Sequence, residues 1–366
     1  EPADASVNMV LGDASGFASA STLAALPGIR NLTIGREDGT GTISVPAGGF
    51  AFNANGTLEL VNRTVNIGTV GDSTATLTNT NGNVTITSDN INIVQAVTAN
   101  GGNGKVTLRQ QTAANELRLG SGLSNSSVGQ INAAILAVGR ADGGNLVFDS
   151  DISTTATSVH LLSGNRVEGV NGGVSASNLA VTAGGGATIS DSAFNFTTLA
   201  ASLGGSSDSS ITSSSADWGL GTVDGVSGLV RQTGATGAAT LTAGNTLSLN
   251  APINFNNTAT TLNLRAETLN ASAATVSNQT LATVTMDRTG AGTLTVGGTG
   301  GAIQQASLAR FNNVSNLVIG NTSRDLSVVG AVSVGVGNRV TLQGQTVNGI
   351  SGSNTLTATT GSMKVE

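Results

Sequence analysis

The chain has 366 residues and a formal net charge of −6; 10% of its residues are charged and 2% are aromatic. It has no cysteine and one histidine, which excludes disulfide scaffolds, iron–sulfur clusters, thiol catalysis and histidine-based zinc sites. The acidic balance and the presence of only two lysines argue against a nucleic-acid surface.

The composition favours a repetitive β-rich fold over disorder. Hydrophobic residues make up 38% of the chain and four residues are proline, whereas disordered chains are less hydrophobic and richer in proline. A globular core of this size normally needs large aromatic side chains to fill it. A solenoid does not, because its core is a narrow column that grows one repeat at a time. The 51 glycines and 36 asparagines suit the turns of such repeats.

In chain order, a stretch that could form a turn or two of helix comes first, at residues 21–26. Short runs of alternating apolar and polar residues follow, closed by turn residues such as those at 81–83. The clearest runs cover residues 58–61, 65–67, 75–78, 84–87, 91–93, 239–242, 247–249, 262–264, 294–296, 326–328 and 340–342. β-Branched residues dominate these runs, which predicts short β-strands.

Two segments interrupt the pattern of short strands. Residues 128–137 have a spacing that could form a second short helix. The Ser-rich segment at residues 204–218 predicts a loop extruded from one coil, not a linker between domains.

An internal repeat indicates how the strands are arranged. The pattern Leu-x-Ile/Val-Gly occurs at Leu32, Leu136 and Leu317, followed in the first two copies by Arg-x-Asp-Gly. A sandwich remains possible, but a propeller would need repeats with signature aromatics. The sequence therefore predicts an all-β, right-handed parallel β-helix (β-solenoid) that forms a single domain over residues 1–366. Coils of roughly 22 residues would give about 17 coils, with glycine at the corners and asparagine amides stacked in ladders.

The chain resembles the repeat region of filamentous-haemagglutinin-like exoproteins. The resemblance is carried by the copies of the Leu-x-Ile/Val-Gly repeat and by the Thr-Ala-Gly-Asn-Thr-Leu-Ser-Leu turn at residues 242–249. Residues 195–201 and 344–350 have the same character. The resemblance implies a secreted β-helical rod at a Gram-negative cell surface, which serves adhesion and is exported by an outer-membrane secretion partner. The family's Asn-Pro-Asn-Gly type of secretion motif is not found in the sequence, so we expect an internal or processed portion of a longer exoprotein.

The beginning of the sequence is consistent with that expectation. Residues 1–6 have neither the basic start nor the apolar segment of a signal peptide. No apolar run approaches the roughly 18 residues of a membrane-spanning helix.

Candidate catalytic residues are few. Asp149 and Asp151, with Asp142 nearby in sequence, form the best carboxylate cluster, but aspartate is common in turns. His160 lies on an alternating run and is expected to be a lone surface or core histidine, and Trp218 is expected to pack the base of the Ser-rich loop instead of binding a ligand. We therefore expect no catalytic residues, no metal and no cofactor.

Other motifs also have simple structural interpretations. Residues 101–104 lack the aspartate of calcium-binding glycine repeats. Thr-x-Thr rows are spaced too irregularly along the sequence to predict an ice-binding face. Arg36 and Arg140 are expected to pair with the turn carboxylates Asp38 and Asp142.

Asn-x-Ser/Thr sequons are numerous, and they are candidate glycosylation sites. They begin at Asn31, Asn55, Asn62, Asn83, Asn125, Asn195, Asn256, Asn270, Asn278, Asn313 and Asn321.

The sequence thus predicts a non-enzymatic extracellular rod that acts as an adhesin or structural exoprotein. Its partner would be a receptor or glycan on a host or neighbouring cell. One alternative is a subunit that stacks end to end into an extracellular filament. A further alternative, a polysaccharide-degrading enzyme, would need three or more convergent carboxylates.

Overall fold

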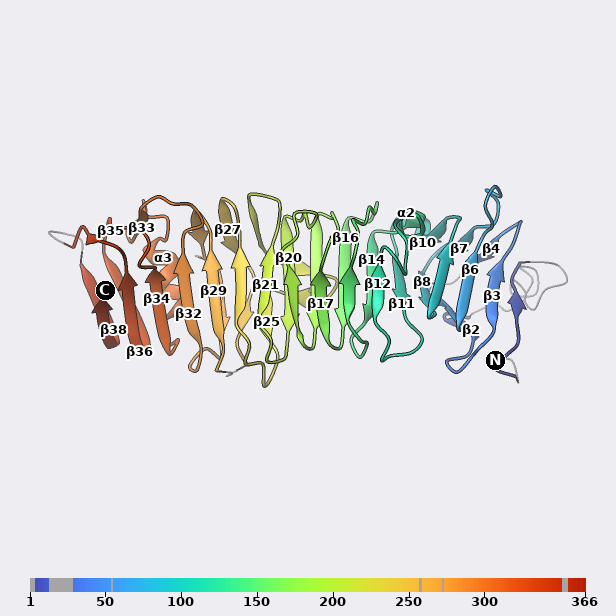
Figure 1. Ribbon diagram of the computed structural model, residues 1–366, viewed down its shortest axis with the longest axis horizontal. Coiled ribbons are helices and arrows are strands. Elements are labelled where there is room, and N and C mark those ends of the chain that lie inside the picture. Colours follow the sequence, from blue (N-terminus) through green and yellow to red (C-terminus); the bar gives the residue numbers. More distant parts are fainter. Residues whose placement is uncertain (1–3, 13–28, 54, 257–258, 272, 351–354) are drawn as a thin grey trace. The chain divides into compact units, whose positions relative to one another are not determined.

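The computed structural model describes residues 4–12, 29–53, 55–256, 259–271, 273–350 and 355–366. Strands make up 48% of the described residues and helices 4%, and the parallel sheets stack as a β-solenoid of about 14 turns. The predicted all-β solenoid is therefore confirmed. The chain divides into two compact units, Glu1–Ser177 and Asn178–Glu366, and within each unit the coils follow one another in sequence order (Figure 1). That the whole chain forms a single domain stays a prediction.

Unit 1 pairs its strands in parallel from one coil to the next. The main sheet of unit 1 contains β2, β5, β8, β11, β14 and β16. Three further sheets are formed by β1-β3-β6-β9, β4-β7-β10-β13 and β12-β15-β17. The elements are β1 (Met9–Val10), β2 (Leu32–Gly35), β3 (Thr42–Val45), β4 (Phe50–Phe52), β5 (Thr57–Val61), β6 (Thr64–Ile67), β7 (Leu77–Asn79), β8 (Asn83–Thr87), β9 (Asn90–Ile93), β10 (Val97–Ala99), η1 (Asn100–Gly102), β11 (Lys105–Arg109), β12 (Leu117–Leu119), α2 (Asn125–Gly129), β13 (Ile131–Asn132), β14 (Ile135–Arg140), β15 (Leu146–Phe148), β16 (Ser158–Ser163) and β17 (Arg166–Gly169).

The core of unit 1 consists of columns of apolar side chains, each stacked on its counterpart in the next coil. One column contains Leu58, Val84, Val106, Leu136 and Val159, and a second contains Ile34, Leu60, Ile86, Leu108, Val138 and Leu161. These side chains are buried because the alternation of period two turns every second residue of a strand inward. Each buried aliphatic side chain stabilises the fold by about 1.5–3 kcal/mol relative to an exposed one.

Unit 2 contains one sheet of β19, β21, β26, β29, β32, β34, β36 and β38, and a second sheet built on β18, β20, β22, β27 and β30. The elements are β18 (Asn178–Ala183), β19 (Gly186–Ile189), β20 (Thr198–Leu203), β21 (Ser209–Thr212), β22 (Trp218–Leu220), β23 (Thr222–Val223), β24 (Val226–Ser227), β25 (Leu229–Arg231), β26 (Ala239–Thr242), β27 (Thr246–Leu249), β28 (Ile253–Asn254), β29 (Thr261–Arg265), β30 (Thr268–Asn270), β31 (Val276–Ser277), β32 (Thr283–Asp287), β33 (Leu294–Val296), α3 (Gln305–Leu308), η2 (Ala309–Phe311), β34 (Asn316–Gly320), β35 (Leu326–Val328), β36 (Val332–Gln343), β37 (Val347–Asn348) and β38 (Leu356–Val365).

The loop predicted at residues 204–218 is wrong in its central part. Residues 209–212 form β21, which pairs in register with β19 and β26. Ser209 and Ile211 face inward and are buried, and the Ser209 hydroxyl accepts a hydrogen bond from the Ala187 amide. Ser209 thus occupies an inward position that an apolar residue would normally fill. The alternation of apolar and polar residues that predicts a strand is therefore not visible in the Ser-rich sequence.

The excursion from the solenoid begins a few residues later, with the hairpin of β23 and β24. It interrupts the strand that follows β20, because β22 pairs with the first part of β20 and β25 with the last part. Asp224 and Gly225 both have positive φ, as a tight two-residue hairpin turn requires. Val223 of the hairpin packs on Ala180 and Ala200, so the hairpin covers part of the outer face of this sheet.

The helix expected at residues 128–137 is shorter than predicted and begins earlier. It is α2, whose N-terminus is capped by the Ser124 hydroxyl accepting from the Ser127 amide at 3.1 Å. After Gln130 the chain forms β13 and β14, since strand pairing with neighbouring coils outweighs the weak helical spacing. The helix expected at residues 21–26 lies outside the described residues.

The number of coils is about 14, not the expected 17, because some coils are longer than 22 residues. The coil that contains α2 places Leu136 opposite Val106, 30 residues earlier. The coil that contains α3 places Leu317 opposite Val284, 33 residues earlier. In both, a short helix and its flanking turns lengthen the coil without adding a turn of the solenoid.

Asparagine side chains fasten the starts of strands to the preceding coil. The Oδ1 atom of Asn31 accepts a hydrogen bond from the Thr57 amide at 2.8 Å, and that of Asn83 accepts from the Lys105 amide at 2.9 Å. The predicted amide-to-amide contacts occur in isolated pairs, Asn53–Asn81 and Asn254–Asn278. Capping of a backbone N–H is therefore another way in which asparagine links successive coils.

The Leu-x-Ile/Val-Gly repeat marks a sharp corner at the end of a strand. Its glycines, Gly35, Gly139 and Gly320, all have positive φ. At each position a Cβ atom would collide with a carbonyl oxygen of the next coil, that of Val61, Leu162 or Gln343. Only glycine satisfies both conditions without strain, which explains why the repeat recurs in two different sheets.

Candidate functional site

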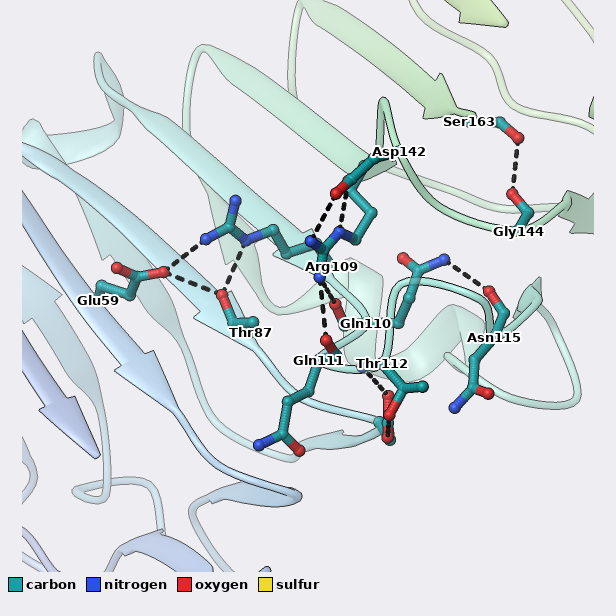
Figure 2. Close-up of polar contacts among 12 residues, drawn as sticks. Glu59, Thr87, Arg109, Gln110, Gln111, Thr112, Asn115, Asp142, Gly144 and Ser163 are labelled. Atoms are coloured by element: carbon teal, nitrogen blue, oxygen red, sulfur yellow. Dashed lines mark hydrogen bonds and ion pairs between the residues drawn. The ribbon is translucent and has the colours of Figure 1, made fainter. Parts of the chain in front are cut away.

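A network of polar contacts lies on the outer face and at one corner of the main sheet of unit 1 (Figure 2). In the centre, Arg109 of β11 reaches across β8 to Glu59 of β5. The Nη2 atom of Arg109 lies 2.8 Å from Oε1 of Glu59, and its Nε donates to the Thr87 hydroxyl at 2.8 Å. Thr87 in turn donates to the same Glu59 oxygen at 3.0 Å. These three side chains link three successive coils.

A shallow groove of about 370 Å³ lies beside this triad and is named here the Glu59 groove. Its lining residues are Asn31, Thr33, Thr57, Glu59, Thr85, Thr107 and Arg109. Strand register stacks Thr33, Glu59, Thr85 and Thr107 in one outward column. The groove therefore offers hydroxyl groups, an amide, a carboxylate and a guanidinium at the spacing of the strands, about 4.8 Å.

At the corner of the main sheet, Arg140 binds Asp142 through two parallel contacts of 2.7 and 2.8 Å. The Nη1 atom of Arg140 also donates to the carbonyl oxygen of Gln111 at 2.9 Å. These hydrogen bonds from Arg140 hold the pKa of Asp142 below its ordinary value, and the Arg140 pKa is raised in return. The predicted pairs Arg140–Asp142 and Arg36–Asp38 are thus both confirmed.

The segment that follows β11 extends the network to neighbouring coils. The Nε2 atom of Gln111 donates to the carbonyl oxygen of Gly39 at 2.9 Å. Thr112 donates its amide and hydroxyl hydrogens to the two carboxylate oxygens of Asp89, at 2.9 and 2.6 Å. These contacts could not be predicted from the sequence, because glutamine and threonine at a turn carry no specific signal.

The carboxylates singled out in the sequence have separate partners. Asp142 pairs with Arg140, whereas Asp149 accepts hydrogen bonds from the amide and hydroxyl of Ser121. Those bonds from Ser121 lower the pKa of Asp149. Asp151 is exposed. Within the described residues, no group of three or more histidine and acidic side chains is positioned to hold a metal ion.

His160 and Trp218 are both buried. His160 lies in β16, next to Ala137 of β14, and is 6% exposed. The Trp218 ring meets Phe196 edge to face at a centroid distance of 5.4 Å, and its Nε1 donates to the Thr242 carbonyl at 3.0 Å. Trp218 therefore packs the interior of unit 2, so it offers no platform for a sugar ring.

The candidate glycosylation sites differ in accessibility. Asn62 is 1% exposed, which leaves no room for a glycan in the folded chain. Several others use their side-chain amides in contacts within the fold: Asn31, Asn83, Asn125, Asn256, Asn278 and Asn321. Asn55, Asn195 and Asn313 are exposed. Asn270 is also exposed. Modification at any of these sites stays a prediction.

Comparisons with protein family models, with curated proteins and with solved structures find no match to this chain. Among the residues that the structure describes, no helix has the length and apolar character needed to cross a bilayer. Chemically, the Glu59 groove can donate and accept hydrogen bonds over an open surface.

Proposed function

We propose that this chain is a non-enzymatic, extracellular β-solenoid that belongs to an adhesin or structural exoprotein similar to filamentous haemagglutinin. The solenoid fold supports the proposal, since stacked coils give a repeated outer surface on which polar side chains can be displayed. The proposed location is the surface of a Gram-negative cell, after export by an outer-membrane partner.

The observation that carries the proposed role is the Glu59 groove. Its hydroxyl and amide groups lie at the outer surface, where they can bond a receptor or a glycan on another cell. The Arg109–Glu59 pair gives the groove one fixed donor–acceptor combination, with side-chain exposures of 34% and 22%.

The proposal is tested by incubating the fluorescently labelled chain with epithelial cells and with bacterial cells. We expect saturable binding that an excess of the unlabelled chain displaces. Binding that rises linearly with concentration and is not displaced would contradict an adhesive role. Release of reducing ends from a panel of soluble polysaccharides would show that the chain is an enzyme instead.

A second proposal, self-association into a filament, is favoured by β38. Within the described residues this ten-residue strand pairs only with β36, so its other edge presents unpaired backbone groups. A second copy could add a strand there. Electron microscopy of the purified chain decides this: fibres would support end-to-end stacking, and discrete short particles at all concentrations would exclude it.

A further inference from the structure

The sheet formed by β1, β3, β6 and β9 ends abruptly within unit 1. β9 pairs with β6 on one side. On its other side the next coil supplies β12, but β12 belongs to a different sheet and pairs with β15. β9 is therefore an edge strand in the middle of a stack of coils.

The backbone of β9 shows which groups face the open edge. The amides of Asn90 and Val94 donate to Arg63 and Ile67 of the preceding coil, at 3.0 and 2.9 Å. Because successive residues of a parallel strand point their backbone groups to opposite sides, those of Ile91 point away from β6.

The open edge of β9 is only partly closed by α2. The hydroxyl of Ser127, in α2, accepts the Ile93 amide at 3.3 Å. Among the described residues nothing equivalent meets the N–H and C=O of Ile91. This residue therefore leaves a backbone donor and a backbone acceptor at the edge.

A groove of about 440 Å³ runs along this edge and is named here the β9 groove. Asn66 of β6 and Asn90 and Asn92 of β9 line it. Leu117 and Leu123 also line it and, with Ile91, give the groove an apolar patch. The groove thus offers both polar and apolar contacts to a ligand.

The charge around the β9 groove is predominantly negative. Asp89 and Glu116 line it, and Arg118 is the basic residue among its lining groups. Arg118 lies 2.7 Å from the Glu116 carboxylate and 3.6 Å from that of Asp149. Two carboxylates thus pair with Arg118, and Asp89 adds a third negative charge to the lining of the groove, which favours a ligand with positive charge.

We propose that the β9 groove binds an extended, basic peptide segment of a partner protein, which adds a strand to the edge of β9. Its backbone bonds the Ile91 N–H and C=O, one apolar side chain enters the patch formed by Leu117 and Leu123, and flanking lysine or arginine residues approach Asp89 and Glu116. An exposed strand edge beside a pocket for alternate side chains is the arrangement used in strand-addition recognition. None of the lining residues is aromatic, so the groove lacks the stacking platform that favours a sugar.

The test uses the 366-residue chain and four synthetic hexapeptides, Lys-X-Lys-X-Thr-Lys with X as Val, Ile, Leu or Phe. Titration calorimetry should show saturable binding of at least one peptide, and ¹⁵N spectra should show a shift of the Ile91 amide. The control peptide has proline at both X positions, which keeps the charge and prevents strand pairing. We expect at least a tenfold weaker affinity for it.

Two variants locate the contact. Ile91→Pro removes the amide hydrogen that faces the groove, a substitution that edge strands tolerate, and should weaken binding at least tenfold. Glu116→Lys reverses a charge at a half-exposed position, so it tests the proposal even if Ile91→Pro does not fold. The proposal is overturned if no hexapeptide binds, if the proline peptide binds equally well, if both variants bind like the unmodified chain, or if a neutral oligosaccharide displaces the peptide.

Discussion

At the residue scale, the corner glycines show how closely one coil approaches the next. Gly139 follows the apolar residues of β14, has a φ of 88° and lies directly against the Leu162 carbonyl. Gly71 has nearly the same φ, 89°, but its missing side chain would point into open space. An alanine at Gly71 would bear only the cost of a positive φ, whereas an alanine at Gly139 would also collide with the Leu162 carbonyl.

Gly139→Ala is therefore expected to lower the free energy of unfolding by more than Gly71→Ala does. Positive φ alone costs an alanine about 1–2 kcal/mol, and at Gly139 the carbonyl of Leu162 must also move. Denaturant titration of both variants measures the difference. Equal losses at the two positions would contradict the proposed collision.

The Arg140–Asp142 pair gives a prediction about pH. Since hydrogen bonds from Arg140 lower the pKa of Asp142 in the folded chain, the carboxylate stabilises the fold above its ordinary pKa of about 3.8. That contribution is lost as the pH falls through the lowered pKa. Asp142→Asn should therefore reduce the Tm at pH 6 and have no effect at about pH 2. Asp151→Asn, at an exposed aspartate, is the control, and a Tm difference for Asp142→Asn that persists at low pH would refute the prediction.

Arg231 is a buried cation in unit 2. Its side chain is 0% exposed, Nη2 donates to the Gly237 carbonyl at 2.5 Å, and its Nε and Nη1 have no hydrogen-bond partner among the described residues. Burial lowers the pKa of Arg231, which the charge of Asp208 partly offsets.

Because a buried charge with unsatisfied donors is costly, Arg231→Met is expected to raise the free energy of unfolding by about 1 kcal/mol or more. Arg231→Lys keeps the charge and should bring no gain. Chemical denaturation of both variants is the measurement, and a less stable Arg231→Met chain would show that the guanidinium has a favourable role in the interior.

At the element scale, short alternating strands could be predicted, but the path of the chain between them could not. The runs around Leu58 and Val84 were predicted as strands and form β5 and β8. Their pairing depends on coil length, which varies with inserted helices such as α2 and α3. Thr240 and Thr285, 45 residues apart in sequence, occupy one outward column in the structure, with Asn263 between them.

The Glu59 groove could be predicted even less. Glu59, Thr85 and Thr107 come from three coils of different length, and a shift of one residue in register would turn each of them inward. The Arg140–Asp142 pair was predicted because its partners are two residues apart. Contacts within a turn can thus be read from sequence, whereas contacts between coils need the register.

Hydrogen exchange tests the assignment of β21. The Ser209 amide donates to the Ala238 carbonyl at 2.7 Å, and residues 209–212 lie between β19 and β26. We expect these four amides to be protected as well as those of β26. Exchange as fast as in the exposed turn at residues 71–74 would restore the original prediction of a loop.

At the scale of the whole molecule, the proposed adhesin is a solenoid that displays polar columns to a partner. The outward columns of unit 1 contain the Glu59 groove, and unit 2 has an outward column of similar residues that includes Thr240 and Thr285. Arginine at half-buried outward positions adds bulk and charge without entering the core. Matched double substitutions, one pair in each unit, therefore distinguish binding at a specific site from non-specific adsorption to cells.

The most direct test compares cell binding of three chains: the unmodified chain, the Thr85→Arg/Thr107→Arg variant in the Glu59 groove and the Thr240→Arg/Thr285→Arg control in unit 2. Circular dichroism first establishes that all three have the same strand content. We predict that the groove variant loses at least tenfold in affinity for cells and that the control binds like the unmodified chain. Equal binding by all three chains would contradict the claim that the Glu59 groove is the adhesive surface.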